Sequence, residues 1–185
     1  MTYNAKEHWE KIYQTKKPNE VSWYQEKPET SLNLISETNV DKDASIIDIG
    51  AGASKLVDNL LALGFRNVTV LDVSSSALNI AKKRLGDRAN NVKWAVSDLR
   101  EFETNDKYDI WHDRAVLHFL TEKEDISKYV EKVRRLLKQN GYLIVSTFSE
   151  KGPKKCSGLD IKQYSKDSMI KLFSGFKHIK SFEEE

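Results

Sequence analysis

The sequence is poor in cysteine: Cys156 is the only one, so no disulfide can form within the chain. A lone thiol favours a reducing compartment. No apolar run approaches the roughly 20 residues that a membrane-spanning helix needs, and the first residues lack the apolar core of a secretory signal peptide. These absences predict a soluble, cytoplasmic protein without a membrane partner.

The chain also carries little net charge. Its 30 Lys and Arg residues exceed its 28 Asp and Glu residues by two, and the basic residues form no focused stripe. Nucleic-acid binding normally uses such a stripe, so we expect no nucleic-acid partner. The spacing of the four histidines does not match a metal site, and we expect no metal. They are His8, His112, His118 and His178.

A strand–turn–helix unit is the most informative stretch. Apolar residues 46–49 lead into Gly50-Ala51-Gly52, and a helical pattern over 55–63 ends at Gly64. Glycine suits a sharp turn that a ligand approaches closely. Such a unit opens sheets that bind nucleotide-like ligands at their carboxyl edge. A single Gly-x-Gly also occurs in ordinary turns, so the neighbouring residues must decide.

Strands and helices alternate along the rest of the chain. This order predicts an α/β fold, a Rossmann-like, doubly wound and mostly parallel sheet with helices on both faces. We divide one domain, 1–185, into an N-terminal helical lid (1–40), a cofactor-binding core (44–149) and a C-terminal part (150–185). Further strands are expected over 67–72, 92–96, 108–111, 142–148 and 177–182, and helices from the Ser74–Ser76 cap to Gly86, over 126–138 and over 165–173.

Aromatic residues gather in the N-terminal segment. Trp9, Ile12 and Tyr13 share one face of a predicted helix that ends before Pro18, and Pro28 precedes a second helix. Two interpretations are open: a lid over the ligand, or plain packing against the end of the sheet.

Three acids define the expected ligand. Asp48, Asp72 and Asp98 end or follow three strands, and parallel strands end at one edge. Asp72 lies about 20 residues beyond the first glycine, where a carboxylate binds a ribose diol. Lys55 replaces the third glycine of a dinucleotide site, and Asp48 favours a cationic amino-acid group over a diphosphate. With Asp98 accepting from an adenine amino group, these features describe S-adenosylmethionine.

The sequence resembles the class I S-adenosylmethionine-dependent methyltransferases. The stretch from Asp48 to Ser54 is similar to their first motif, with Ser54 where many members carry glycine. Asp72-Val73 is similar to the ribose-binding pair and Asp98-Leu99 to the adenine pair. The resemblance implies cofactor contacts from Asp48, Gly50, Ala51, Gly52, Asp72, Val73, Asp98, Leu99 and His112.

Two longer motifs narrow the resemblance to small bacterial-type methyltransferase-domain proteins. They are Trp-His-Asp-Arg-Ala-x-x-His-Phe-Leu-Thr at 111–121 and Gly-Pro-x-x-Cys-Ser-Gly-Leu at 152–159. Such proteins continue for about 20 residues into a last antiparallel strand, within ordinary strand and hairpin lengths. We therefore expect a sheet that lacks this strand.

For catalysis, His112, Asp113 and Arg114 follow the fourth strand, beside the expected methyl position. His112 suits a general base, and Arg114 suits a clamp for an acceptor carboxylate. The alternative is an Asp113–Arg114 ion pair that caps the next helix, with His112 only contacting the cofactor. His118 is interpreted as a satisfied core histidine, and Cys156 is not expected to be a nucleophile.

The predicted activity is transfer of a methyl group to an acceptor, an enzyme of class EC 2.1.1. A small-molecule acceptor is favoured over a protein side chain because the aromatic segment could enclose a compact pocket. Two alternatives stay open: a protein that binds S-adenosylmethionine without turnover, and a nicotinamide-dependent oxidoreductase, against which Lys55 argues.

Overall fold

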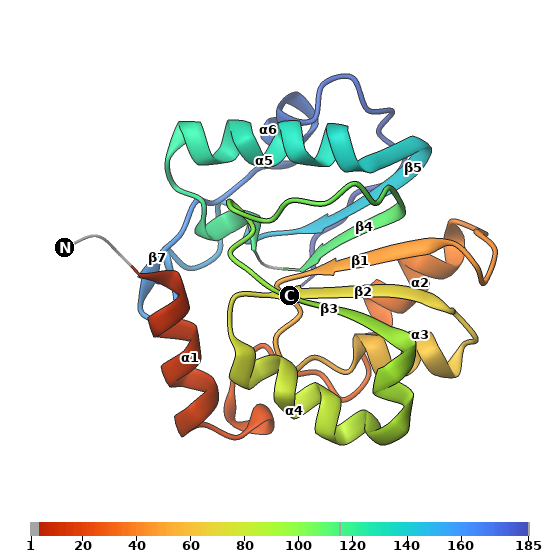
Figure 1. Cartoon of the computed structure of the whole chain (residues 1–185). Helices are drawn as coiled ribbons and strands as arrows, with labels where there is room; N and C mark the ends of the chain where they lie inside the picture. Colours follow the sequence, from red (N-terminus) through yellow and green to blue (C-terminus); the bar gives the residue numbers. More distant parts are fainter. Residues whose placement is uncertain (1–3, 115, 185) are drawn as a thin grey trace.

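A five-stranded parallel sheet forms the centre of the computed structural model, which describes residues 4–114 and 116–184. Its strand order is β3-β2-β1-β4-β5, and all four strand pairings are parallel (Figure 1). The predicted fold class is therefore confirmed. The strands are β1 (Ser45–Ile49), β2 (Asn67–Asp72), β3 (Val92–Val96), β4 (Tyr108–Arg114) and β5 (Leu137–Ser146).

Helices cover both faces of this sheet. Figure 1 shows α5 and α6 on one face and α2, α3 and α4 on the other. The α-helices are α1 (Ala5–Thr15), α2 (Glu29–Glu37), α3 (Leu56–Ala62), α4 (Ser75–Leu85), α5 (Lys123–Leu136) and α6 (Lys166–Leu172). Short 3₁₀ helices are η1 (Pro18–Glu20), η2 (Gly86–Asn91) and η3 (Leu117–Phe119). None of the helices in the described ranges is long and apolar enough to cross a membrane.

The apolar core has two layers because the inner strands are buried on both faces. All five residues of β1 are buried. Alternate side chains point to opposite faces: Ile47 packs with Trp111 beneath α5, whereas Ile46 packs with Ile110 and Leu60 of α3. The register places Asp48 beside His112 and Ile49 beside Asp113, so the carboxyl ends of β1 and β4 lie together.

Local capping matches the sequence pattern at two helices. The Ser74 hydroxyl accepts from the Ala77 amide at the start of α4, at 3.1 Å, as predicted for the serine cap. Gly86 ends α4 with a positive φ of 59°. Ser165 caps α6 in the same way, accepting from the Ser168 amide at 3.2 Å.

The boundary between α5 and β5 differs from the prediction. The helix ends at Leu136 rather than 138, and β5 starts at Leu137 rather than 142. Asn140, with φ of 65°, and Gly141 are of the residue types that commonly follow the end of a helix. They instead lie within the irregular start of β5, where the pairing register with β4 shifts. A β-bulge uses such a left-handed residue without ending the strand.

The predicted strand over 177–182 is wrong, because residues 177–184 form no strand. Ile179 is 71% exposed and Phe182 is 51% exposed, so the apolar pattern does not reflect burial. The segment runs past α2 instead, where the Lys180 ammonium lies 2.8 Å from the Glu37 carboxylate and the Thr30 hydroxyl bonds to Glu184. Side-chain contacts have replaced pairing with the sheet.

The segment that follows β5 contains a small hairpin. Its strands are β6 (Lys155–Cys156) and β7 (Leu159–Asp160), paired antiparallel. Both turn residues have positive φ, 52° at Ser157 and 81° at Gly158, as a two-residue hairpin turn requires. Residues 1–3 of the predicted lid, Ala115 of the first long motif and Glu185 lie outside the described residues.

Candidate functional site

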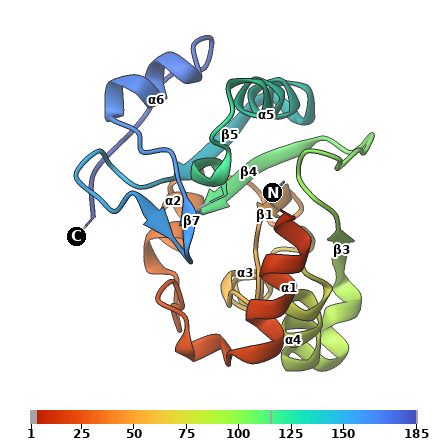
Figure 2. The ribbon, with the colours of Figure 1, turned by 90° about the vertical axis from the view of Figure 1, so that its left-hand side faces the viewer.

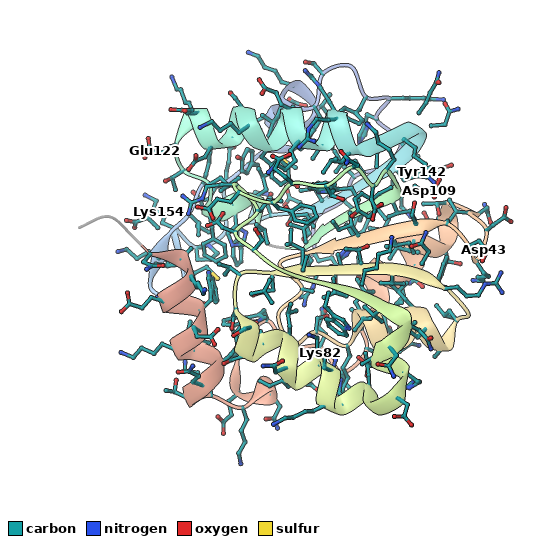
Figure 3. All side chains as sticks on the ribbon, in the orientation of Figure 1. Asp43, Lys82, Asp109, Glu122, Tyr142 and Lys154 are labelled. Atoms are coloured by element: carbon teal, nitrogen blue, oxygen red, sulfur yellow. The ribbon has the colours of Figure 1, made fainter. Side chains whose placement is uncertain are left out.

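A cavity of about 1120 Å³ opens at the carboxyl edge of the sheet. Figure 2 looks onto this edge, with α1 and the β6–β7 hairpin in front of the strand ends. In Figure 3, Glu122 and Lys154 lie at this end, whereas Asp43, Asp109 and Tyr142 lie at the opposite one. Pockets for one small ligand usually occupy about 300–1000 Å³, so the cavity has room for a cofactor together with an acceptor.

The glycine turn after β1 forms one wall. Gly50 and Gly52 have φ of 60° and 56°, a left-handed conformation that favours glycine. A Cβ at Gly50 would lie 2.0 Å from the Val116 side chain, and one at Gly52 would lie 2.1 Å from the Tyr13 hydroxyl. Gly50 and Ala51 line the cavity. The close packing shows why this turn needs both glycines.

Asp72 joins that turn to the next helix. Its carboxylate accepts from the Gly52 amide at 2.8 Å and from the Ser74 amide at 2.8 Å. Burial raises the pKa of Asp72 to about 6, and these two amide bonds oppose the rise. Asp72 and Val73 both line the cavity. The predicted ribose acid therefore lies where a ligand can reach it.

Asp98 and Leu99 line the same cavity at the end of β3. The Arg100 guanidinium donates to both Asp98 oxygens, at 3.0 and 2.6 Å. Burial opposes ionisation of Asp98, but these bonds outweigh it and hold its pKa below the usual value. Arg100, which the sequence analysis missed, also lies 3.6 Å from Asp125. The position of Arg100 between Asp98 and Asp125 is visible only in the folded structure, and no local sequence pattern indicates it.

His112 and Asp48 are not among the lining residues. The two ring nitrogens of His112 lie 2.7 Å from the Asp48 carboxylate and 2.9 Å from the Ser31 hydroxyl. His112 is 2% exposed. The trio fastens β4, β1 and α2 together, and its placement behind the lining does not support a catalytic role for His112.

Asp113 is buried and caps the chain after β4. Its carboxylate accepts from the Val116 amide at 2.7 Å, the Leu117 amide at 3.2 Å and the Tyr129 hydroxyl at 2.7 Å. Burial raises the pKa of Asp113 to about 6. Asp113 therefore caps the start of the next helix, η3, as the alternative interpretation of Asp113 predicted.

Arg114 does not pair with Asp113 in this arrangement. Its guanidinium donates to the Trp23 carbonyl at 3.2 Å, and Arg114 lines the cavity. Within the described ranges, it makes no ion pair with a carboxylate. The structure therefore brings Arg114, but not its two predecessors, to the site.

His118 lies in the cavity wall and is fully buried. Neither ring nitrogen has a hydrogen-bond partner among the described residues, so the interpretation as a satisfied core histidine is wrong. Its ring centroid lies 4.2 Å from that of Phe119 and 5.0 Å from that of Phe148. Burial lowers the pKa of His118 to about 4, which keeps the imidazole neutral near pH 7.

Helix α1 closes the front of the cavity. Trp9, Tyr13 and Trp23 line it, and Trp9 packs edge-on against Phe119 at 5.2 Å between centroids. The Glu10 carboxylate holds α1 to the start of α4, accepting from the Ser74 and Ser76 hydroxyls, each at 2.6 Å. Although burial opposes ionisation, the serine bonds lower the pKa of Glu10 to about 2.

Among the residues that the structure describes, no group of three or more His, Cys, Asp or Glu side chains could hold a metal ion. Cys156 lines the cavity, but burial raises the pKa of its thiol, which disfavours the nucleophilic thiolate.

Comparison with known proteins points to one family. The family described as "Methyltransferase domain" matches residues 47–143. Human EEF1A lysine methyltransferase 2 is 23% identical over 158 residues, 77% of this chain and 67% of the relative. Ribosomal protein L11 methyltransferase from Staphylococcus haemolyticus is 30% identical over 150 residues, 76% of this chain and 46% of the relative. The chain thus spans 67% of the length of the first of these relatives and less than half, 46%, of the second.

Solved structures show the same fold. The N-methyltransferase NodS from Bradyrhizobium japonicum, in complex with S-adenosylhomocysteine, has a TM-score of 0.63 at 22% identity, over 77% of this chain and 72% of that one. Phosphoethanolamine N-methyltransferase 1 from Haemonchus contortus, in complex with phosphoethanolamine and S-adenosylhomocysteine, has a TM-score of 0.72 at 18% identity. The match covers 94% of this chain and 40% of that one.

Proposed function

Since the chain belongs to the methyltransferase-domain family, we propose that it binds S-adenosylmethionine and transfers the methyl group to a small-molecule acceptor. One observation carries the proposal. A single cavity runs from the glycine turn, past Asp72 and Asp98, to the aromatic wall around Phe119. The glycine turn, Asp72 and Asp98 would form the cofactor side of this cavity, and the aromatic residues around Phe119 would form the compartment for the acceptor.

The residues at the edge fit the cofactor. The left-handed turn at Gly50 and Gly52 is packed against Val116 and Tyr13, and Gly50 and Ala51 line the cavity, so the backbone of this turn would face the cofactor. Asp72 would bind the ribose hydroxyls, because its pKa of about 6 leaves it ionised near pH 7. Asp98 and Leu99 would bind the adenine. Further contacts from Asp48 and His112 would be indirect, through the strands that they fasten.

Arg114 is the best candidate for a carboxylate contact. It lines the cavity, and guanidinium groups bind carboxylates through paired hydrogen bonds. Burial raises the pKa of Tyr13, whose hydroxyl lies against the glycine turn, and the positive charge of Arg114 opposes this rise. We therefore assign Arg114 to the methionine carboxylate of the cofactor rather than to the acceptor.

When bound, the cofactor would supply an electrophilic methyl group on sulfur for displacement by the acceptor. The protein aligns the two partners and excludes water. Helix α1 and Trp23 cover the cavity and suit the predicted lid. Relatives are named for both protein and small-molecule acceptors; the covered aromatic wall supports a small molecule. A cytoplasmic location stays a prediction.

Calorimetric titration of the 185-residue chain with S-adenosylhomocysteine and with NAD tests the cofactor assignment. We expect S-adenosylhomocysteine to bind and NAD not to bind. Tight NAD binding would favour an oxidoreductase, and no binding to a folded protein would refute the assignment. Formation of S-adenosylhomocysteine with candidate acceptors then separates an enzyme from a binding protein without turnover.

A further inference from the structure

The buried ring of His118 has no structural role that accounts for its polarity. Buried polar groups in native proteins nearly always have a hydrogen-bond partner, and leaving one without costs about 1–3 kcal/mol. Both nitrogens of His118 lack a partner within the described ranges. The contrast with His112, whose two nitrogens are both bonded, shows that the fold can satisfy a buried histidine here.

The surroundings of His118 are aromatic. Phe119 and Phe148 contact its ring, Trp9 packs on Phe119, and all three line the cavity with His118. Aromatic faces attract cations, most strongly where water is excluded. The exposed Glu122 at the cavity mouth adds attraction for a positive charge. This compartment therefore suits an amine better than an anion.

His118 is also the group best placed to accept a proton. The Asp72 carboxylate is engaged by two backbone amides, and the Asp98 carboxylate is engaged by Arg100. His118 is neutral near pH 7 because burial lowers its pKa to about 4. One ring nitrogen of a neutral imidazole carries a free lone pair.

We propose that the acceptor compartment binds a primary or secondary amine and that His118 is its catalytic residue, which takes the proton that the amine loses. The inference rests on the proposed methyl transfer. The bound ammonium first gives one proton to the free nitrogen of His118, which passes it to water, and this leaves a lone pair on the amine nitrogen. That lone pair forms the bond to the methyl carbon while the carbon–sulfur bond breaks with its electron pair going to sulfur, and the product leaves as the methylated ammonium.

The test compares the wild type with His118→Ala and His118→Asn. Transfer from S-adenosylmethionine is measured to 2-phenylethylamine and to Nα-acetyl-lysine amide, with phenol as an oxygen acceptor. S-adenosylhomocysteine affinity is measured on each variant by calorimetry. His178→Ala, an exposed histidine outside the cavity, is the matched control.

We expect at least one amine to be methylated in preference to phenol. His118→Ala should lower kcat/KM at least 100-fold, the low end for loss of an acid–base group, and added imidazole should restore part of the rate. His118→Asn should lower kcat more than it raises KM, because an amide keeps a hydrogen bond but takes up no proton. S-adenosylhomocysteine affinity should stay within about twofold, since a cofactor contact is not removed.

Three results would overturn the inference. They are preferred methylation of phenol, unchanged kcat in folded His118→Ala, and equal losses of cofactor affinity and turnover. S-adenosylhomocysteine binding without transfer to any amine would overturn it too, while leaving the cofactor site in place. If the wild type binds no S-adenosylhomocysteine, the proposed function itself fails, and the inference fails with it.

Discussion

The regions around the two buried histidines differ in what their polar atoms contact. Around His112, the side chains of Asp48 and Ser31 occupy both ring nitrogens, and β4, β1 and α2 meet. Around His118, aromatic rings surround the imidazole and neither nitrogen is bonded within the described ranges. Both side chains are almost fully buried, so burial does not distinguish them.

The difference teaches how to separate structural from chemical polar groups. A buried polar side chain with all partners supplied by the protein contributes to the fold, and a ligand has little to offer it. One that lacks protein partners in a cavity wall is left for a ligand or a water molecule to bond. By this criterion, His112 fastens the sheet, and His118 is the residue that we propose to serve the acceptor.

The largest effect on stability is expected from removing His112, whose two ring nitrogens are both hydrogen-bonded. His112→Ala leaves the buried Asp48 carboxylate and the Ser31 hydroxyl without their partner, which should lower the free energy of unfolding by about 3–5 kcal/mol. His118→Leu, which removes only unpaired polar atoms, should cost less than about 1 kcal/mol. Urea unfolding followed by circular dichroism measures both. Similar losses in the two variants would contradict the comparison.

The second prediction uses pH. The folded-state pKa of His118, about 4, lies below the unfolded value of about 6.5, so the unfolded chain binds more protons between these values. Stability from neutral His118 is therefore present above pH 6.5 and lost as pH falls towards 4. The wild type should lose on the order of 3 kcal/mol relative to His118→Leu over this range.

The difference in stability between the wild type and His118→Leu isolates the contribution of His118. Asp72 and Asp113 have raised folded-state pKa values of about 6, so their contribution is present below pH 4 and lost as pH rises through 6. Both proteins share that opposite trend, and it cancels in the difference. Unfolding curves at half-unit steps from pH 7 to pH 4 measure it. A difference independent of pH would show that His118 is not buried neutral.

The third prediction concerns Asp72, at the carboxyl edge of the sheet, where it lines the cavity. Asp72→Ala should weaken binding of S-adenosylhomocysteine by about 1.5–3 kcal/mol, the value of a hydrogen bond to a charged group. Asp43→Ala is the control, because Asp43 is an exposed carboxylate at the opposite end of the sheet (Figure 3). Calorimetry compares the two. Unchanged affinity in Asp72→Ala would refute the ribose assignment.

The smallest effect is expected at the lid. Glu10→Gln weakens the link from α1 to Ser74 and Ser76, and because the contact is close to solvent it should cost less than about 1 kcal/mol. Hydrogen exchange measures this loss: the backbone amides of α1 should exchange faster in Glu10→Gln than in the wild type, while those of the rest of the chain stay unchanged. Glu7→Gln, on the same helix and exposed, should leave exchange unaltered. Equal changes in both variants would refute the anchoring role.

Much of the fold could be predicted because local patterns dictate it. The strands at 67–72 and 92–96 and the Ser74 cap follow from apolar runs and side-chain capping, which depend on neighbours in sequence. The strand at 177–182 could not be excluded in this way, because strand formation depends on a pairing partner distant in sequence. The same limit hid the bulge at Asn140.

The site was predictable only in part, for a related reason. Glycine turns and acids after strands have fixed places in a parallel sheet, so the spacing predicted that Gly50, Asp72 and Asp98 lie at one edge, where they line the cavity. Their contacts with the cofactor stay a prediction. The roles of His112 and His118 depend on Ser31, Asp48 and Phe148, which lie far apart in the sequence. Nothing local in the sequence distinguishes a partnered histidine from an unpartnered one.

A crystal structure of the complex with S-adenosylhomocysteine tests the central claim most directly. We predict ribose hydroxyls within hydrogen-bond distance of the Asp72 carboxylate, about 2.6–3.2 Å, and a sulfur atom that faces the compartment of His118, with His112 still bonded to Asp48. A ligand bound away from Asp72, or one whose sulfur contacts His112, would contradict the account.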